Sequence, residues 1–122
     1  MPTNVLAIVS DLFFVVKIGD AAKRAGRSVQ FTSDPSLALE KARQAPALIL
    51  IDLNNDRAQP IDLVRTLKST PETKDVPVIG YLSHVHVELK KKAEEAGCNQ
   101  VLARSALDGR LSKLFASDPA AG

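Results

Sequence analysis

The sequence has 122 residues, of which 45% are hydrophobic, with a formal net charge of +2 and a single cysteine. A chain of this length forms one domain that buries about two thirds of the surface its unfolded form would expose, and one cysteine excludes an internal disulfide. The basic residues are too scattered for a nucleic-acid site. No apolar run reaches the roughly 20 residues of a membrane helix, and we find no secretion signal, so we expect a cytoplasmic protein.

The first half of the chain alternates short apolar runs with longer amphipathic segments. Gly26 ends the first amphipathic segment, as glycine often does just after a helix. Asp34 and Pro35 are an N-cap and a first-turn proline, so a second helix begins there. The run 47–51 is the most hydrophobic and is expected at the centre of a sheet. In chain order we predict strand 5–9, helix 12–25, strand 28–32, helix 35–44 and strand 47–51.

The second half continues this alternation. Pro60 opens a helix that ends before Pro71, and Gly97 ends the next helix. Near the end of the chain Leu107 and Leu111 repeat at helical spacing, so one face of that segment is core. In chain order we predict helix 60–70, strand 78–82, helix 85–96, strand 100–103 and a last helix through 107–115, followed by a disordered tail over 117–122.

Strict alternation of strands and helices predicts an α/β fold. The expected architecture is a doubly wound, five-stranded parallel sheet of flavodoxin-like type, with strand order 2-1-3-4-5, formed by one domain over residues 1–116. In such sheets the functional site lies at the carboxyl ends of the strands. The polar or strand-ending residues expected at this edge are Ser10, Asp11, Asp52, Leu82, Ser83 and Arg104.

Two carboxylates at this edge, Asp11 and Asp52, predict a cation site. Like charges brought together repel, so the pair is stable when a cation lies between them or one acid is protonated. Mg²⁺ prefers oxygen ligands and often binds one or two carboxylates, and the backbone carbonyl of Asn54 is placed to complete such a site. The simpler alternatives are that Asp11 only caps the helix that follows it, and that Asp52 is a bare cap.

Four sequence features occur together: the acid after the first strand (Ser10-Asp11), the acid in Ile51-Asp52-Leu53-Asn54, the passage 67–79 and Ala96-Gly97 before the last strand. In this combination they resemble the receiver domain of bacterial response regulators, the fold typified by the chemotaxis regulator. The resemblance covers about residues 4–116. It implies a single-domain receiver that is not an enzyme and that accepts a phosphoryl group on Asp52 from a histidine kinase, a phosphotransfer protein or a small phosphodonor. Asp11, Asp52 and the Asn54 carbonyl would hold Mg²⁺.

Several positions depart from the pattern of that family. Ser10 stands where a second acid is usual, which implies weaker Mg²⁺ binding. Leu82 stands where a threonine or serine normally contacts the phosphoryl group, and Ser83 is one residue too late unless a bulge near Gly80 restores its place.

Arg104 replaces the lysine of the family, and Val101 replaces an aromatic residue that takes part in switching. Because arginine pairs bidentately with carboxylates, Arg104 would clamp Asp52 in a salt bridge. This predicts an alternative function: a phosphorylation-independent receiver that acts as a protein interaction module, with Asp52 held by Arg104.

The resemblance also implies partners other than the phosphodonor. A downstream protein target would dock on the face formed by helix 85–96, strand 100–103 and the last helix, and a homodimer is compatible with the same face.

Phe13 and Phe14 mark either a partner surface or half-buried packing. The His84-Val85-His86 segment is interpreted as a polar loop because no third metal ligand accompanies it, and Cys98 as a semi-buried, unreactive thiol.

Two other classes of function are disfavoured by the same residues. A flavin or nucleotide binder of flavodoxin type needs a phosphate-binding loop after the first strand, whereas Ser10-Asp11 has no glycine and opens with an acid. A hydrolase with an aspartate nucleophile needs an acid or base partner that the sequence does not offer.

Overall fold

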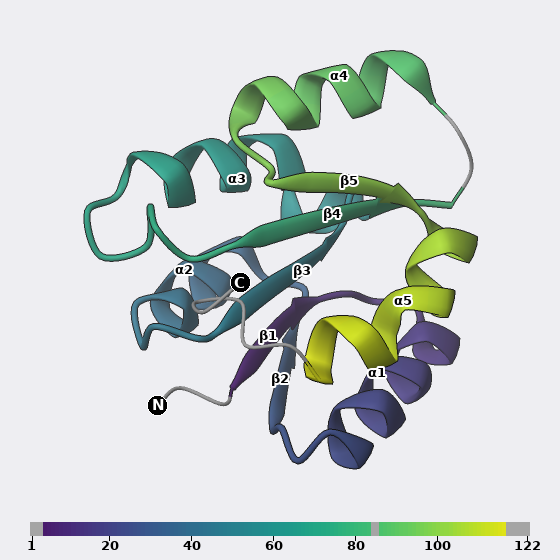
Figure 1. Ribbon diagram of the computed structural model, residues 1–122. Coiled ribbons are helices and arrows are strands. Elements are labelled where there is room, and N and C mark those ends of the chain that lie inside the picture. The colour runs from purple at the N-terminus through teal and green to yellow at the C-terminus, as the bar shows by residue number, and fades with distance from the viewer. Residues whose placement is uncertain (1–3, 84–85, 117–122) are drawn as a thin grey trace.

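The computed structural model describes residues 4–83 and 86–116, which form a parallel sheet with helices on both faces (Figure 1). The strands are β1 (Val5–Ile8), β2 (Val29–Thr32), β3 (Leu48–Asp52), β4 (Val78–Leu82) and β5 (Gln100–Ala103). Neighbouring strands are parallel throughout, and their order is β2-β1-β3-β4-β5. This confirms the predicted doubly wound, flavodoxin-like sheet.

The helices follow the strands in the predicted alternation. They are α1 (Leu12–Arg24), α2 (Pro35–Ala42), α3 (Pro60–Ser69), α4 (Val87–Ala96) and α5 (Arg104–Ala116), with a short 3-10 helix, η1 (Asp56–Ala58), before α3. The last helix begins directly after β5, earlier than the apolar spacing indicated. The predicted start of the fourth helix at residue 85, residue 84 of the histidine segment and the predicted tail over 117–122 lie outside the described residues.

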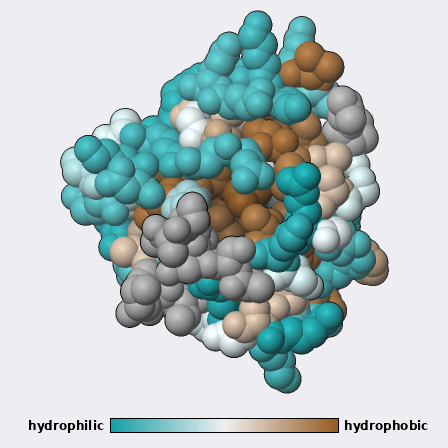
Figure 2. Space-filling view, in the orientation of Figure 1, coloured by the Kyte–Doolittle hydropathy of each residue, from teal (hydrophilic) through white to brown (hydrophobic). Residues whose placement is uncertain are grey.

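The sheet is covered on both faces by hydrophobic side chains from different helices. On one face β1, β3 and β4 pack against α2, α3 and α4, with Ile49, Ile51 and Leu67 fully buried. On the other face they pack against α1 and α5 through Phe14 and Phe115. Figure 2 shows hydrophobic residues in the middle of the face in view, with hydrophilic residues around them. Within the described residues, no helix is long and apolar enough to cross a membrane.

The passage 67–79 fixes the end of the sheet opposite to the predicted site. The Lys68 Nζ donates hydrogen bonds to the Val76 carbonyl at 2.8 Å and to the Asn99 side chain at 2.9 Å, and Thr73 donates to the Leu67 carbonyl at 2.6 Å. Asn99 in turn accepts from the N–H of Val78, the first residue of β4. The hydrogen bonds of this passage therefore stabilise the fold at the end of the sheet away from the predicted site.

Strand β4 is regular, which decides the position of its last residues. Its register with β5 runs from Ile79 to Leu82 without a skipped residue, so the bulge considered near Gly80 does not form. A Cβ at Gly80 would lie 2.8 Å from the Leu53 side chain, so a larger residue there would force that side chain to shift. Leu82 is 2% exposed and belongs to the core beneath α3 and α4. Its side chain is thus structural, and no hydroxyl reaches the site from this position.

Candidate functional site

The carboxyl edge of the sheet brings most of the predicted site residues together. Asp11 follows β1 as the N-cap of α1, Asp52 is the last residue of β3, and Arg104 is the first residue of α5. The charges of Arg104 and Asp11 both influence the pKa of the Asp52 carboxyl, which places the three groups in one neighbourhood. The convergence follows from the topology, because parallel strands end at the same edge.

Asp11 has two structural roles at once. One carboxylate oxygen accepts a hydrogen bond from the Phe13 N–H at 3.0 Å, which caps α1, and the other forms an ion pair with Arg104. Each of the two side chains is 32% exposed, so the pair lies at the rim of the core. The helix-cap interpretation of Asp11 therefore holds, and its second carboxylate oxygen is paired with Arg104.

Arg104 binds a different acid from the one the sequence indicated. The predicted salt bridge to Asp52 is wrong, because the guanidinium pairs with Asp11. The physical reason is the position of two aromatic rings at the start of α1: the Arg104 Cζ lies 4.9 Å from the centroid of Phe14 and 6.0 Å from that of Phe13. These cation–π contacts hold the guanidinium on the α1 side of the site. Arg104 acts on Asp52 only through its charge.

Asp52 is held by its own loop. Its Oδ1 accepts a hydrogen bond from the Asn54 N–H at 2.9 Å. Burial raises the pKa of the Asp52 carboxyl, and the Asp11 charge raises it further, whereas the Asn54 N–H and the Arg104 charge oppose the rise. Desolvation dominates, as expected for an acid at the end of a buried strand.

The side chain of Asn54 links two loops in a way that the sequence did not indicate. Its Oδ1 accepts hydrogen bonds from the Ser83 N–H at 2.7 Å and from the Ser83 hydroxyl at 3.1 Å. Ser83 is thereby held at the edge of the sheet next to the loop that follows Asp52. Only the Asn54 carbonyl was predicted to take part in the site, so the role of its side chain is an addition to the prediction.

Tyr81 is a site residue that sequence reasoning missed. It is the register partner of Asp52 across β3 and β4, and it stacks on Phe14 with ring centroids 4.8 Å apart. The side chain is 2% exposed, and its hydroxyl has no hydrogen-bond partner among the described residues. The only sequence signal was a tyrosine in an otherwise aliphatic strand, which by itself indicates packing.

The donor set suits a hard cation with one restriction. Asp11, Asp52 and the Asn54 carbonyl offer oxygen ligands of the kind that Mg²⁺ prefers, with water completing its shell. The described residues contain no cluster of three or more histidine, cysteine or acidic side chains, so two carboxylates are the maximum. Because Arg104 occupies one oxygen of Asp11, a cation at this site has to compete with the guanidinium.

The remaining candidates are structural. His86 is the N-cap of α4 and accepts a hydrogen bond from the Leu89 N–H at 3.1 Å. Cys98 is buried, and burial raises the pKa of its thiol to about 11, which keeps it unreactive at neutral pH.

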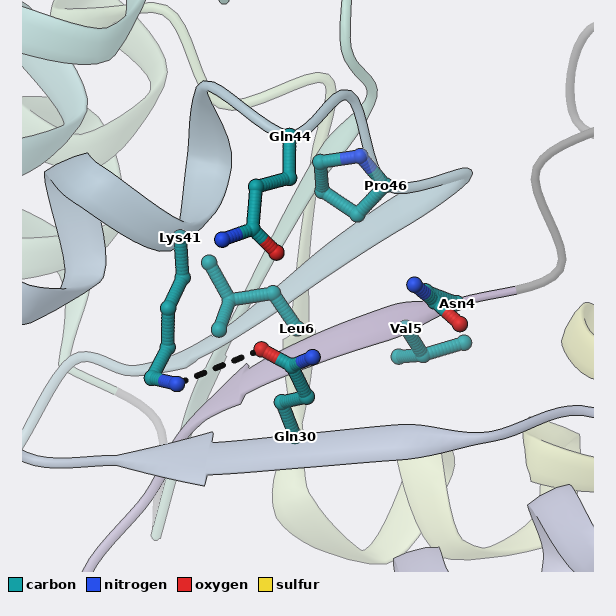
Figure 3. Close-up of a pocket in the computed structure, with 7 residues that line it drawn as sticks. All are labelled: Asn4, Val5, Leu6, Gln30, Lys41, Gln44 and Pro46. Carbon is teal, nitrogen blue, oxygen red and sulfur yellow. Dashed lines mark hydrogen bonds between the residues drawn. The ribbon is translucent and has the colours of Figure 1, made fainter.

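A cavity between α2 and the starts of β1 and β2 has a volume of about 10 Å³, which is room for about one water. The Lys41 Nζ donates a hydrogen bond to the Gln30 side chain across it (Figure 3). This cavity is too small for a ligand.

Replacing Asp52 with asparagine is expected to stabilise the fold at neutral pH. The pKa of the Asp52 carboxyl is raised by folding, so the native state binds more protons than the unfolded state between the two pKa values, and stability falls as pH rises through that window. The Asp52→Asn variant lacks this cost, and its carbonyl can still accept from the Asn54 N–H. Urea denaturation of both proteins should show the variant's advantage at pH 7 and its disappearance below the unfolded-state pKa.

The exposed Asp56→Asn change is the matched control, because it removes the same charge from the neighbouring η1 helix. It should leave the pH dependence of unfolding almost unaltered. An Asp52→Asn variant less stable than the wild type at pH 7 would mean that the Asn54 hydrogen bond and the Arg104 charge outweigh burial.

Comparison with known proteins identifies the fold. No family model and no curated protein matches the sequence, but many solved structures match the structure. A response regulator from Hahella chejuensis superposes with a TM-score of 0.82 at 19% identity, covering 93% of this chain and 92% of that chain. The phosphorylated cyanobacterial phytochrome response regulator RcpA gives 0.79 at 20% identity, covering 95% and 90%.

The Mn²⁺-bound form of response regulator Rcp1 gives a TM-score of 0.77 at 19% identity, with 94% of this chain and 90% of that chain covered. Each alignment spans nearly the full length of both this chain and the matched chain. The chain therefore has the receiver fold of response regulators, as the sequence motifs predicted.

Proposed function

We propose that this chain is a single-domain response regulator receiver that accepts a phosphoryl group on Asp52 in a two-component phosphorelay. The observation that carries the proposal is the meeting of Asp52, Asp11 and Arg104 at the carboxyl edge of a receiver fold. Ligands of open α/β sheets bind at this edge. The phosphorylated RcpA and the Mn²⁺-bound Rcp1 share the fold, which supports phosphate and metal chemistry here.

The proposed reaction is a transfer from a phosphohistidine or a small acyl phosphate. A carboxylate oxygen of Asp52 attacks phosphorus and forms a new P–O bond, while the bond from phosphorus to the donor nitrogen or oxygen breaks and the donor leaves with the electron pair. Asp52 Oδ1 is engaged by the Asn54 N–H, and Oδ2 has no hydrogen bond among the described residues. We therefore assign the attack to Oδ2.

The neighbouring residues of this chain provide the charge balance. Asp11, Asp52 and the Asn54 carbonyl would hold Mg²⁺, which when bound neutralises charge on the phosphoryl oxygens. Arg104 supplies a fixed positive charge on the α1 side of the site. Attack by water on phosphorus later returns Asp52 and releases inorganic phosphate, so the domain is an acceptor that is reset and not an enzyme acting on a separate substrate.

The proposal includes cytoplasmic partners. A histidine kinase or phosphotransfer protein would supply the phosphoryl group, and a protein target would dock on the face of α4, β5 and α5, where a homodimer would also form. Lys90, Lys91 and Lys92 follow one another on α4 and are exposed, as are Glu88, Glu94 and Glu95 on the same helix, so a target surface with charges of both signs would complement this face.

Two observations favour a second candidate, a phosphorylation-independent interaction module. Both carboxylate oxygens of Asp11 are already used, by the Phe13 N–H and by Arg104, and Leu82 is buried where a hydroxyl would contact phosphate. Such a module would keep the same docking face in one fixed state. The two candidates differ in whether Asp52 takes a phosphoryl group.

Intact mass spectrometry after incubation with acetyl phosphate and Mg²⁺ separates them. We expect the wild type to gain one phosphoryl group, the Asp52→Asn variant to gain none, and the Asp56→Asn control to behave as the wild type. A folded wild type with neither a mass gain nor calorimetrically detectable Mg²⁺ binding would contradict the phosphoacceptor function and leave the interaction module.

A further inference from the structure

The buried hydroxyl of Tyr81 takes no part in the proposed phosphoryl transfer, although its residue lies beside the acceptor. Tyr81 on β4 pairs in register with Asp52 on β3. In a parallel sheet, register partners present their side chains on the same face. Asp52 lies two residues after Leu50 in β3, and alternate residues of a strand share one face, so Asp52 is on the same face as Leu50. Leu50 and Tyr81 both belong to the core between the sheet and helices α1 and α5. The phenol and the carboxylate therefore share one face.

The hydroxyl is an unpaired donor in a buried environment. The Tyr81 side chain is 2% exposed, and the oxygen finds no hydrogen-bond partner among the described residues. Buried polar groups are nearly always hydrogen-bonded, so an unpaired one in a native protein calls for a partner. The other such atom in the described residues is the Asn55 Nδ2, in the loop after Asp52.

The Tyr81 phenol lies near the charged residues at the carboxyl edge of the sheet. The charges of Asp52, Arg104 and Asp11 all act on it, and burial raises the pKa of Tyr81 far above its ordinary range, so the hydroxyl keeps its proton and can donate. The ring is fixed by its stack on Phe14 at an interplanar angle of 27°, and the same Phe14 ring carries the Arg104 guanidinium. A rigid donor loses little freedom when it forms a bond.

The other hydroxyl that the sequence offered at this strand end is engaged elsewhere. Leu82 has none, and the Ser83 hydroxyl donates to the Asn54 side chain. We propose that the Tyr81 hydroxyl donates a hydrogen bond to the phosphoryl group carried by Asp52. The inference rests on the proposed phosphoacceptor function and adds to it a phosphoryl-contacting residue from the strand next to the acceptor.

Binding of beryllofluoride, a phosphoryl mimic that attaches to a carboxylate, tests this contact at equilibrium. In the presence of Mg²⁺, fluorine NMR titration of the wild type and of Tyr81→Phe should show affinity reduced about tenfold in the variant, because a hydrogen bond to a charged group is lost. The Tyr81→Phe change keeps the ring. Its urea-unfolding midpoint should equal or exceed that of the wild type, since the unliganded protein loses only an unpaired buried group.

Two control variants test whether a loss of beryllofluoride affinity comes from the Tyr81 hydroxyl, from the packing of its ring, or from the acceptor Asp52. Phe14→Leu keeps the hydroxyl and removes its stacking partner, together with the ring against which the Arg104 guanidinium lies, so its affinity should fall less than that of Tyr81→Phe. Asp52→Asn should not bind the mimic at all.

Unchanged affinity in Tyr81→Phe would overturn the inference and leave the phosphoacceptor function standing. An equal loss of affinity in Phe14→Leu would assign the effect to packing and also overturn it. A lowered unfolding midpoint in Tyr81→Phe would show that the hydroxyl has a structural partner, and the inference would fall for that reason. Absence of binding by the wild type would overturn the proposed function and this inference together.

Discussion

Replacing Arg104 with alanine is expected to tighten Mg²⁺ binding about tenfold, a gain of ~1.4 kcal/mol. In the wild type the guanidinium pairs with Asp11 and is supported by the Phe14 ring, so a metal ion must displace it to reach that carboxylate. The alanine variant frees the Asp11 oxygen and also removes a positive charge that repels the cation. Isothermal titration calorimetry with MgCl₂ measures the change directly.

Two other variants make this result specific. Arg104→Lys keeps the charge but loses the planar fork, so its affinity should lie between those of the wild type and the alanine variant. Arg110→Ala removes the same charge from an exposed position on the same helix and should change Mg²⁺ affinity little. Equal binding by Arg104→Ala would show that the guanidinium does not compete with the metal, and weaker binding would show that it helps to hold it.

Replacing Phe14 with alanine is expected to lower the free energy of unfolding by about 3–5 kcal/mol. The side chain is 1% exposed, packs in the core between the sheet and helices α1 and α5, stacks on Tyr81 and supports the Arg104 guanidinium. The alanine variant loses this burial and leaves a cavity below the site. Because a domain of this size is stable by only about 5–15 kcal/mol, urea denaturation should show a large shift of the midpoint.

The adjacent Phe13 provides the control. It is 64% exposed, and its ring contacts the Lys17 and Arg104 side chains at the surface. Phe13→Ala should therefore cost less than about 1 kcal/mol. Similar costs for the two variants would contradict the division of this pair into a core residue and a surface residue.

The periodicity of apolar residues predicted most of the architecture. Strands β4 and β5 occur at the predicted residues, and the order of the sheet follows from alternation and crossover handedness. The start of α5 at Arg104 was missed for a physical reason. The first turn of that helix has no buried residue before Leu107, so no apolar repeat marks it, and the helix follows β5 without a loop.

The sequence predicted which charged residues lie together at the carboxyl edge, but not which acid pairs with Arg104. Topology alone places Asp11, Asp52 and Arg104 at one edge, but the partner of the guanidinium depends on rotamers and on the rings that it stacks against. Phe14 settles that choice, and its packing could not be known before the angle of α1 on the sheet was known. Tyr81 was missed because a buried tyrosine resembles any large strand residue until the register shows which acid lies opposite.

The position of Tyr81 also gives the protein a built-in optical reporter. The chain has one tyrosine and no tryptophan, so almost all of its near-ultraviolet absorption and emission arises from the ring that lies beside Asp52. Its circular dichroism near 280 nm should be intense, because the ring is held against Phe14 in an asymmetric environment. Events at the carboxyl edge should thus be visible spectroscopically in the unlabelled protein, without an introduced chromophore.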